Sequence, residues 1–231
     1  MVRKTPQKAG AAKERSTPDR ILDAAEQLVQ TRGFNGISYA DIAAEVGVTK
    51  ANLHHHFGSK AELGDALLNR YAAAFNRELA CIEASTSPKA THLEAYAGLY
   101  VAAIRNQRLC LCAVLAAEFD TLPEPMREGV KRFFLDSEAW LVRTVRGGRA
   151  DGSIPAGFPE REVARLLIAG LEGAMLVTRP RHDHVRFKEL ASTLFAGLGL
   201  PQVNGKAKRT ARSGSSARDR TAAAAGSSAP L

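Results

Sequence analysis

The sequence predicts an all-α fold of about nine helices, in which a three-helix N-terminal head of the helix-turn-helix type precedes a larger C-terminal helical bundle. The chain has 231 residues, 45% of them hydrophobic, which is enough for one or two domains with real cores. Apolar residues recur at the spacing of helices, whereas the alternation that marks strands is scarce. Glycine and proline stand mainly at the ends of these apolar segments, where they stop helices.

The first predicted helix begins near Thr17 and ends at Gly33. Thr17 can serve as the N-cap and Pro18 as the first helical residue, where the missing N–H of proline costs nothing. Apolar residues then follow at helical spacing: Ile21, Ala24, Ala25, Leu28 and Val29. Residues 1–15, which precede this helix, are small, polar and basic, so they predict a disordered tail.

A short helix is predicted over residues 38–46. Ser38 is a suitable N-cap, and Asp41 falls at the third helical position, which is the spacing of a capping box. Gly47 follows the last apolar residue and ends the helix most simply with a positive φ.

A second short helix, residues 49–57, follows after a turn too short for anything else. Thr49 caps this helix, and Leu53 and Phe57, four residues apart, face inward. Two short helices joined by a tight glycine turn are the signature of a helix-turn-helix motif. The motif and the helix before it define a predicted DNA-binding domain at residues 16–60.

Six further helices are predicted after the motif. They span about 59–84, from Ser87-Pro88 onward, 109–119, from Pro123 to Gly147-Gly148, 160–178 and 184–198. The segment 109–119 is almost wholly apolar, which indicates a helix buried inside a bundle. Residues 204–231 consist mainly of Ala, Ser, Gly, Lys and Arg and predict a second disordered basic tail.

The net charge of +8 belongs to the two predicted tails. Residues 1–15 carry a net charge of +4 and residues 204–231 carry +5, which leaves −1 for the rest of the chain. The tails can therefore rest on a polyanion such as DNA, but the folded part is not a basic platform.

Three cysteines, Cys81, Cys110 and Cys112, give no disulfide framework and suggest a reducing compartment. No run of 18 apolar residues exists, so no membrane span is expected. The basic N-terminus lacks the apolar region of a secretory signal. These observations together predict a cytoplasmic protein.

The second helix of the motif exposes a face of hydrogen-bonding side chains. Donors, acceptors and one fixed cation on such a face suit base edges and phosphates in a major groove. A lysine at the start of the next helix adds a charge beside free backbone N–H groups, which suits a phosphate. The predicted DNA-contacting residues are Ser38, Tyr39, Thr49, Lys50, Asn52, His54, His55 and Lys60.

The string from Gly33 to Lys60 resembles the DNA-binding signature of the TetR family of transcriptional regulators. Members typically have a Gly-Phe or Gly-Tyr start, then Ser/Thr-x-x-Asp-Ile-Ala, then Gly-Val-Ser/Thr-Lys and a Phe-x-Ser/Asn-Lys end. The matching residues are Gly33-Phe34, Ser38, Asp41-Ile42-Ala43, Gly47-Val48-Thr49-Lys50, Leu53, His55-His56-Phe57 and Ser59-Lys60. The chain departs at Ala51, where glycine is common, and at His54, where tyrosine would offer a hydroxyl to a phosphate.

This resemblance implies a homodimeric, ligand-responsive repressor that binds double-stranded DNA at a pseudo-palindromic operator. Residues 61–203 would then be the ligand-binding and dimerisation domain for a small-molecule effector. By the same resemblance, the last two helices pair across the two-fold axis. Gly170 and Gly173 form part of a small-residue face that fits such an interface, although close packing within one subunit explains them nearly as well.

The body also resembles, more weakly, a TetR subgroup with a cysteine in its sixth helix, at the position of Cys110. Some members of that subgroup sense electrophiles or oxidants through this cysteine. Here Leu109 replaces the usual preceding glycine. A cysteine in an apolar run is more often a small buried hydrophobe, and reactivity requires a lowered pKa and access.

Aromatic residues of the body can line an effector pocket or can simply form the core. The predicted pocket residues are Tyr96, Tyr100, Cys110, Phe133 and Trp140.

No catalytic residue, cofactor or metal site is predicted. Consecutive histidines on a helix point about 100° apart, so His54, His55 and His56 cannot share one metal ion. Two other hypotheses remain beside the regulator: a cytosolic thiol-based redox sensor or enzyme that uses Cys110, and a helical adaptor that binds only proteins. No histidine near Cys110 in the sequence supports the enzyme hypothesis.

Overall fold

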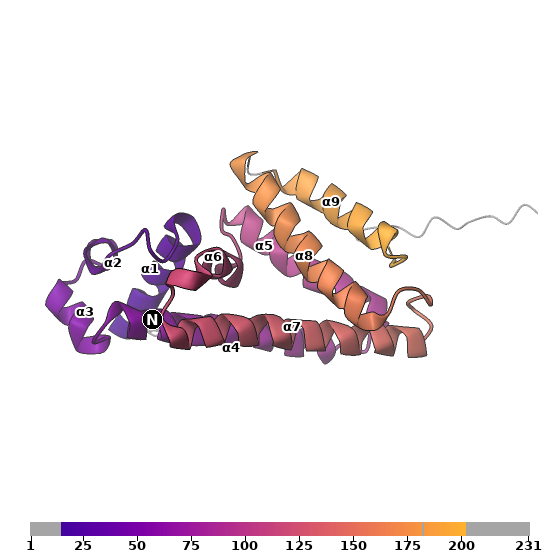
Figure 1. The fold of residues 1–231 in the computed structure, drawn as a ribbon, viewed down its shortest axis with the longest axis horizontal. Coiled ribbons are helices and arrows are strands. Elements are labelled where there is room, and N and C mark those ends of the chain that lie inside the picture. Colours follow the sequence, from indigo (N-terminus) through magenta and orange to yellow (C-terminus); the bar gives the residue numbers. More distant parts are fainter. Residues whose placement is uncertain (1–14, 182, 202–231) are drawn as a thin grey trace, which may run out of the picture.

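The computed structural model describes residues 15–181 and 183–201, and all regular structure in this part of the chain is helical. The predicted all-α fold of about nine helices is confirmed, since the described residues form nine α-helices (Figure 1). The elements are α1 (Thr17–Arg32), α2 (Tyr39–Val46), α3 (Lys50–His56), α4 (Lys60–Glu83), α5 (Lys89–Arg105), α6 (Leu111–Ala117), η1 (Phe119–Thr121), α7 (Glu124–Ala150), α8 (Glu160–Thr178), η2 (Arg179–Arg181) and α9 (His184–Gly197). Apart from Arg15, the predicted tails 1–15 and 204–231 lie outside the described residues.

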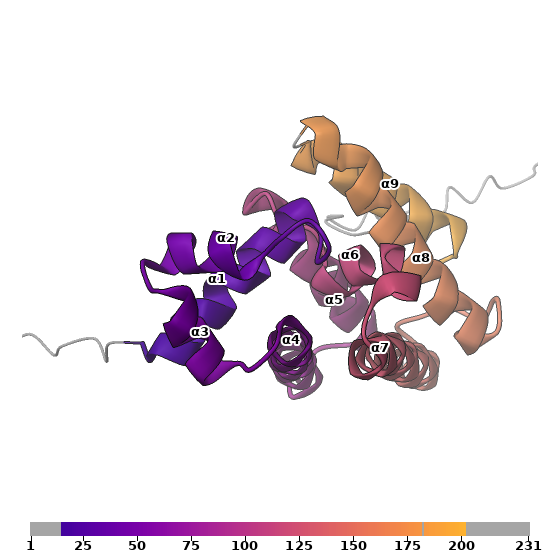
Figure 2. The same cartoon turned by 60° about the vertical axis from the view of Figure 1, so that its left-hand side comes forward.

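Helices α1, α2 and α3 form the head at one end of the molecule (Figures 1 and 2). The predicted N-cap of α1 is wrong by one residue, because the Ser16 hydroxyl accepts the Asp19 N–H at 3.3 Å, which leaves Thr17 inside the helix. Pro18 is compatible with an N-cap at either Ser16 or Thr17. Proline lacks an N–H, and the N–H groups of the first helical turn have no intrahelical partner in any case.

The long helix α4 connects the head to the body and runs beside α7 (Figures 1 and 2). Near its start, α4 approaches its neighbours closely at Gly64. A Cβ at this position would stand 2.5 Å from the Met126 sulfur of α7 and 2.7 Å from the Phe34 ring of the head. The glycine therefore permits a three-way contact between α4, α7 and the turn after α1.

In the body, α8 and α9 form a layer across α5 and α7 (Figure 1). The predicted end of α7 at Gly147-Gly148 is wrong, since the helix continues to Ala150. A Cβ on Gly148 would stand 2.5 Å from a side-chain carbon of Ile154, so this glycine allows the following loop to pack against the helix. Packing rather than helix termination explains the residue.

The predicted helix 109–119 is shorter in the structure than its apolar run. Helix α6 begins after Cys110, which occupies the N-cap position, and the chain passes through Glu118 into η1. The apolar character of the run reflects its burial between other helices, because Leu111, Cys112 and Leu115 are fully buried.

Among the described residues, no helix has the length and apolar character needed to cross a membrane. In the same part of the chain, no three His, Cys, Asp or Glu side chains gather as a metal site would require.

Candidate DNA-reading helix and effector cavity

The capping box predicted at the start of α2 is present. The Ser38 N–H donates to the Asp41 carboxylate at 2.7 Å, and the Asp41 N–H donates to the Ser38 hydroxyl at 3.3 Å. The Ser38 hydroxyl also donates to the Asp41 carboxylate at 2.5 Å, and this bond, together with that from the Ser38 N–H, lowers the pKa of Asp41. At the other end, Gly47 has the predicted positive φ, 75°, and donates its N–H to the Ala43 carbonyl. Short-range contacts therefore fix both ends of the helix that supports α3.

Helix α3 presents its polar side to solvent. The Thr49 hydroxyl caps the helix by accepting the Asn52 N–H at 3.1 Å, and Leu53 anchors the opposite side with no exposed surface. Lys50, Asn52, His54 and His55 are all exposed, and α3 lies at the extreme end of the molecule (Figure 1).

Two rings hold α3 in place against α2. Tyr39 is buried and donates its hydroxyl to the Phe57 carbonyl at 2.9 Å. The exposed His54 packs its ring against Tyr39, with 4.6 Å between centroids, and its Nδ1 lies 3.3 Å from the Gly58 carbonyl oxygen. Of the predicted DNA-contacting residues, Tyr39 is thus the one inside the head, where burial raises its pKa.

Lys60 stands at the start of α4, directly after the N-cap Ser59. Its ammonium lies over the Phe34 ring, 4.6 Å from the centroid, which is a cation–π geometry. Partial burial lowers the pKa of Lys60, while the carboxylates of Glu118 and Asp41 raise it. The charge is therefore held at the junction of the head and α4.

Glu118 of the body forms hydrogen bonds with the head, a contact that the sequence did not predict. The Glu118 carboxylate, just after α6, accepts the backbone N–H of Phe34 at 2.7 Å and that of Asn35 at 3.3 Å. The Asn35 side chain donates to the Thr121 hydroxyl at 2.6 Å. We call these contacts of Glu118 and Thr121 with Phe34 and Asn35 the head–body latch.

Further hydrogen bonds tie α1 to the body near the latch. The buried Gln30 amide donates to the Leu109 carbonyl at 2.8 Å, and the Arg179 guanidinium donates to the Thr31 carbonyl at 3.1 Å. The segment that precedes α6 and the end of α8 therefore both contact the last turns of α1.

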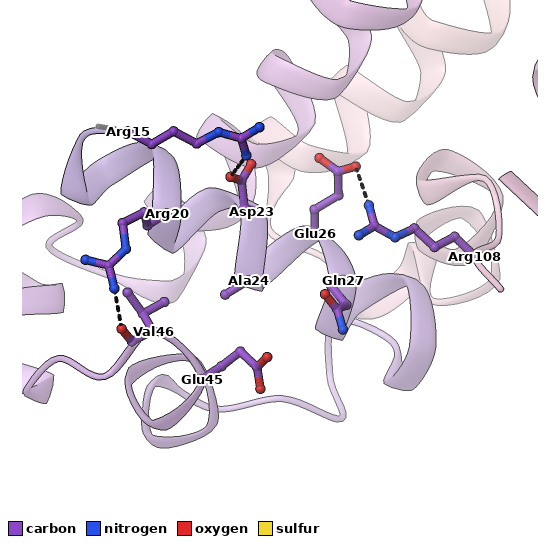
Figure 3. Close-up of a pocket in the computed structure, with 9 residues that line it drawn as sticks. All are labelled: Arg15, Arg20, Asp23, Ala24, Glu26, Gln27, Glu45, Val46 and Arg108. Carbon is purple, nitrogen blue, oxygen red and sulfur yellow. Dashed lines mark hydrogen bonds and ion pairs between the residues drawn. The ribbon is translucent and has the colours of Figure 1, made fainter. Parts of the chain in front are cut away.

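An open hollow of about 420 Å³ lies between α1, α2 and Arg108 (Figure 3). Each of its three arginines already has a partner: Arg15 pairs with Asp23 at 2.5 Å, Arg108 with Glu26 at 3.7 Å, and Arg20 donates to the Val46 carbonyl at 2.7 Å. The hollow is thus a solvated ion-pair surface rather than a ready anion site.

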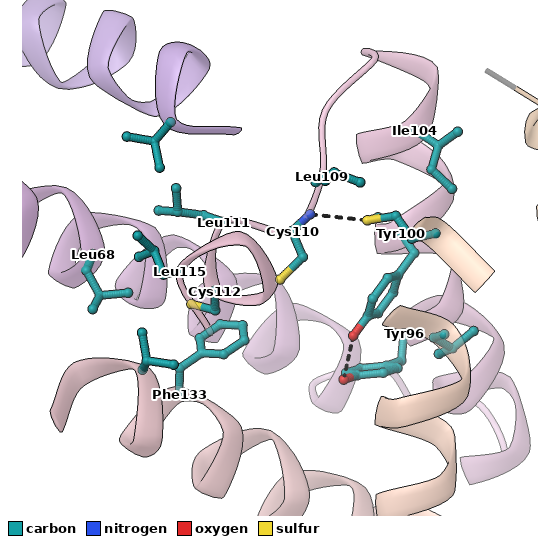
Figure 4. Packing of buried hydrophobic residues seen from close by; sticks show 14 of the residues in the cluster. Leu68, Tyr96, Tyr100, Ile104, Leu109, Cys110, Leu111, Cys112, Leu115 and Phe133 are labelled. Carbon is teal, nitrogen blue, oxygen red and sulfur yellow. Dashed lines mark hydrogen bonds between the residues drawn. The ribbon is translucent and has the colours of Figure 1, made fainter. Parts of the chain in front are cut away.

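The five predicted pocket residues all lie in the core of the body, and Figure 4 shows four of them. The Tyr96 and Tyr100 hydroxyls are 3.2 Å apart, and the Tyr96 ring stacks on Trp140 with 5.7 Å between centroids. Phe75, which the prediction left out, connects Phe133 to this group, at 5.0 Å from Phe133 and 6.1 Å from Tyr96.

A cavity of about 60 Å³ opens beside this aromatic group. It is lined by Tyr71, Phe75, Leu99, Tyr100, Ala103, Cys110 and Met175. Two of the predicted pocket residues, Tyr100 and Cys110, line this cavity, whereas Tyr96, Phe133 and Trp140 pack outside it. We call it the effector cavity because it is the candidate site for the effector predicted from the sequence. Tyr71, Phe75, Leu99 and Ala103 are half-buried, and the other lining residues are buried, so the cavity leads from near the surface into the core.

Glu172 of α8 is the functional candidate that sequence reasoning missed in the body. The residue is only 8% exposed, its Oε1 accepts the Tyr100 hydroxyl at 3.2 Å, and no described residue forms a hydrogen bond with its Oε2. Burial raises the pKa of Glu172 to about 7. The available signal was that Glu172 is the one charged residue between Arg165 and Arg179, in an otherwise apolar stretch.

Cys110 is buried against this carboxyl, and its backbone N–H donates to the Met175 sulfur at 3.1 Å. Burial, together with the nearby Glu172, raises the pKa of the Cys110 thiol well above its usual value. Burial also raises the pKa of Cys112, whereas Cys81 is exposed. The lowered pKa that a reactive cysteine requires is therefore not found at Cys110.

Helices α8 and α9 expose several large apolar side chains. They are Leu166, Leu176, Val177, Val185 and Leu190. The two glycines of α8 play different parts here. A Cβ on Gly170 would stand 2.5 Å from Leu194 of the same subunit, whereas a Cβ on Gly173 would meet no described residue within 4 Å. Packing within the subunit thus explains Gly170 but does not explain Gly173.

Two family models match the chain. Residues 21–67 match the model described as "Bacterial regulatory proteins, tetR family", and residues 90–194 match "Tetracyclin repressor-like, C-terminal domain".

Curated relatives are similar over most of their length. The repressor DhaR of Mycobacterium sp. (strain GP1) is 25% identical over 193 residues, which cover 81% of this chain and 95% of DhaR. The repressor NemR of Escherichia coli (strain K12) is 28% identical over 71% of this chain and 84% of NemR. The regulator LmrA of Bacillus subtilis (strain 168) is 31% identical over 69% of this chain and 85% of LmrA.

A solved TetR-family regulator from Agrobacterium tumefaciens superposes with a TM-score of 0.75 at 32% identity, covering 79% of this chain and 97% of that one. The reduced form of E. coli NemR superposes with a TM-score of 0.69 at 24% identity, covering 82% and 100% of the two chains. Since the models span both the head and the body, and relatives above 30% identity match more than two thirds of this chain and most of their own length, the chain belongs to the TetR family of bacterial regulatory proteins.

Proposed function

We propose that this protein is a ligand-responsive transcriptional repressor, without enzymatic activity, that binds a pseudo-palindromic operator as a homodimer. The observation that carries the proposal is the exposed polar face of α3, held outward by the fully buried Leu53. Relatives that match most of the chain are named transcriptional repressors, which supports the same role. A DNA-binding role places the protein in the cytoplasm, with the bacterial chromosome.

In this proposal, residues 16–60 form the DNA-binding head, and α3 enters the major groove. Lys50, Asn52 and His55 are free to meet base edges or phosphates, because their side chains are exposed. Ser38, Thr49 and Lys60 lie at helix N-termini, where backbone N–H groups favour phosphate. Tyr39 and His54 act mainly by holding the orientation of α3, since their rings pack on each other.

Residues 61–203 form the body, which we propose dimerises through the apolar face of α8 and α9. An exposed apolar surface of this kind favours association, and the identical face of a second copy meets it in a two-fold arrangement. Gly173, with open space above it, lets the partner helix approach closely. The two copies of α3 would then enter grooves about 34–36 Å apart, or a multiple of that spacing.

The route from effector to DNA runs through α6 in this proposal. The helix starts beside the effector cavity at Cys110 and ends at Glu118, whose carboxylate holds the head. A ligand that fits the cavity better when α6 has shifted would release or move the head–body latch. Such coupling requires the effector to bind the two states with different affinity.

A gel shift tests the DNA-binding proposal, with operators first selected from a randomised duplex pool at low ionic strength. We expect wild-type protein to retain specific duplexes with strong salt dependence, and the Lys50→Ala/Lys60→Ala double variant to lose most of this binding. Lys131→Ala, which removes an exposed lysine of α7, is the matched control and should bind as wild type. A wild-type dimer that retains no duplex would overturn the proposal in favour of a protein-binding adaptor.

A further inference from the structure

We infer that Arg70 of α4 is a positioning residue for DNA binding: by holding two carboxylates of α1, it fixes the angle between the head and α4 and thereby the half-site spacing that a dimer accepts. This inference rests on the proposed function, because a half-site spacing has meaning only for an operator-binding dimer. The contacts involved join α1 to α4 and are separate from the head–body latch.

Arg70 contacts α1 at three points along one face. Its Nη1 donates to the Asp23 carboxylate at 2.8 Å and to the Asp19 carbonyl at 3.3 Å. Its Nη2 donates to the Glu26 carboxylate at 2.9 Å. Asp19, Asp23 and Glu26 occupy positions i, i+4 and i+7, so they lie on the same side of the helix. Among the described residues, every side-chain hydrogen bond between α1 and α4 comes from Arg70.

The guanidinium group restricts how α1 can move on α4. It is planar and its N–H groups form a rigid fork, so its two terminal nitrogens hold the two carboxylates in a defined geometry. Asp23 and Glu26 are three residues apart, which is about 4.5 Å along the helix axis. A slide or a rotation of α1 against α4 therefore separates at least one carboxylate from its nitrogen. The contact fixes both the position and the angle of α1 on α4.

The ion pairs of Arg70 are partly shielded and belong to a network. The Arg70 side chain is 27% exposed and that of Glu26 is 20% exposed, so solvent and salt screen this pair less than a fully exposed one. Asp23 also binds Arg15, and Glu26 also faces Arg108 at 3.7 Å (Figure 3). Although partial burial alone would raise it, the hydrogen bonds from Arg15 and Arg70 lower the pKa of Asp23, which keeps this carboxylate charged. A network of this kind holds its geometry better than an isolated surface pair.

The place of Arg70 in α4 connects this contact to DNA reading. Arg70 follows Lys60 by ten residues, which places it about 15 Å along α4 from the end nearest the DNA. Helix α1 packs on α2, and α2 packs on α3, so the angle of α1 on α4 determines where α3 lies relative to the body. In a two-fold dimer the same angle occurs in both copies, and the distance between the two copies of α3 depends on it.

The test compares operators that carry the selected spacer between their half-sites with operators whose spacer is one base pair longer or shorter. One base pair changes the separation by about 3.4 Å and also rotates one half-site about the duplex axis. We expect wild-type protein to bind the altered spacers at least about tenfold more weakly in gel shifts, because rigidly held heads cannot follow the change. In Arg70→Met this ratio should fall to about threefold or less, because the heads can then tilt to meet either spacer.

The ratio separates positioning from stability, because a loss of folded protein weakens binding to all spacers equally. Arg77→Met is the matched control. It removes the same charge from an exposed arginine of α4 that has no carboxylate partner among the described residues, and it should keep the wild-type ratio. Arg70→Lys keeps the charge, but one ammonium group cannot hold both carboxylates in the same geometry, so its ratio should also fall below that of wild type.

Glu26→Gln removes the charge on the other side of the ion pair and should lower the ratio as well. Combined with Arg70→Met, it should lower the ratio no further than Arg70→Met alone, since both changes remove the same contact.

The inference is overturned if wild type binds all spacers alike, if Arg70→Met keeps the wild-type ratio, or if Arg77→Met loses it to the same extent. If Arg70→Met does not fold, Arg70→Lys decides by the same ratio. Wild-type protein that binds operators with a ratio unchanged in Arg70→Met contradicts only this inference, whereas wild-type protein that retains no duplex contradicts the proposed function as well.

Discussion

Helix α3 of the head presents polar side chains to solvent, whereas the body encloses a few polar side chains among aromatic rings. In α3, the exposed Lys50, Asn52 and His55 lie on a helix whose capping hydrogen bonds join residues three or four positions apart. In the body, the Tyr100 hydroxyl meets a carboxylate 72 residues further along the chain. A DNA-reading surface needs little more than a local scaffold, but an enclosed site for a small molecule needs several helices to come together.

The head–body latch connects the two parts of the molecule. Glu118 belongs to the body, yet its carboxylate serves the head as a partner for two backbone N–H groups. Glu118 therefore contributes to holding the head from the end of a seven-residue helix whose other end borders the effector cavity. The predictions below separate the contributions of the head, the cavity and the latch.

The largest effect is expected when the head loses its anchor. Leu53→Ala removes a side chain with no exposed surface, and such truncations cost about 2–5 kcal/mol. Operator binding should be lost in gel shifts while the body stays folded by circular dichroism and near-ultraviolet fluorescence of Trp140. Ala51→Ser, on the exposed side of the same helix, should leave both properties nearly unchanged. Equal loss of the body signal would show that head and body unfold as one unit.

The next effect concerns the pH dependence of stability from Glu172. Its pKa is raised in the folded protein, to about 7, so between the ordinary glutamate pKa and 7 the folded state binds more protons than the unfolded state. This contribution is therefore fully present at acid pH and is lost as the pH rises, by at most about 1.4 kcal/mol per pH unit. Urea denaturation of wild type and Glu172→Gln from pH 5 to 8 measures it. Identical pH profiles for the two proteins would contradict a raised pKa.

The latch should have a smaller effect on stability and a larger one on coupling. Glu118→Gln replaces charge-assisted hydrogen bonds, which are worth about 1.5–3 kcal/mol at most, by neutral ones. We expect operator affinity to change while ligand binding at the cavity is retained, which calorimetry and gel shifts measure in parallel. Glu78→Gln, at an exposed glutamate of α4, is the control and should behave as wild type in both measurements. An unchanged response of operator binding to ligand would show that the latch does not transmit the signal.

The smallest effect is expected at the cap of α2. Ser38→Ala removes one half of the capping box and should cost about 1 kcal/mol in urea denaturation. Thr193→Ala, in which the hydroxyl lost only bonds a carbonyl within its own helix, is the comparison and should cost less. Equal losses from both variants would mean that the cap does not define the start of α2.

Much of the head could be predicted because its determinants are neighbours in the chain. Ser38 and Asp41, Gly47, and Thr49 with Asn52 act within a few residues of one another, and the structure has each as predicted. The N-cap of α1 was wrongly assigned to Thr17 because Ser16 and Thr17 are neighbours and both carry a hydroxyl that can cap a helix. In the body, the end of α7 was wrongly placed at Gly147-Gly148. The sequence does not distinguish a glycine that ends a helix from one that allows a neighbouring side chain to pack closely.

The sequence by itself determined that the fold is helical, where the two helices of the motif begin and end, which of them carries an outward polar face, and which family the motif resembles. Those properties depend on caps, glycine dihedral angles and helical periodicity, all of which act over a few residues. Only the tertiary structure decided that Tyr100 and Cys110 border a cavity, that Glu172 is buried beside them, and that Glu118 holds Phe34. These contacts join residues 62 to 84 positions apart, and whether a carboxyl is solvated or buried depends on which helices pack around it.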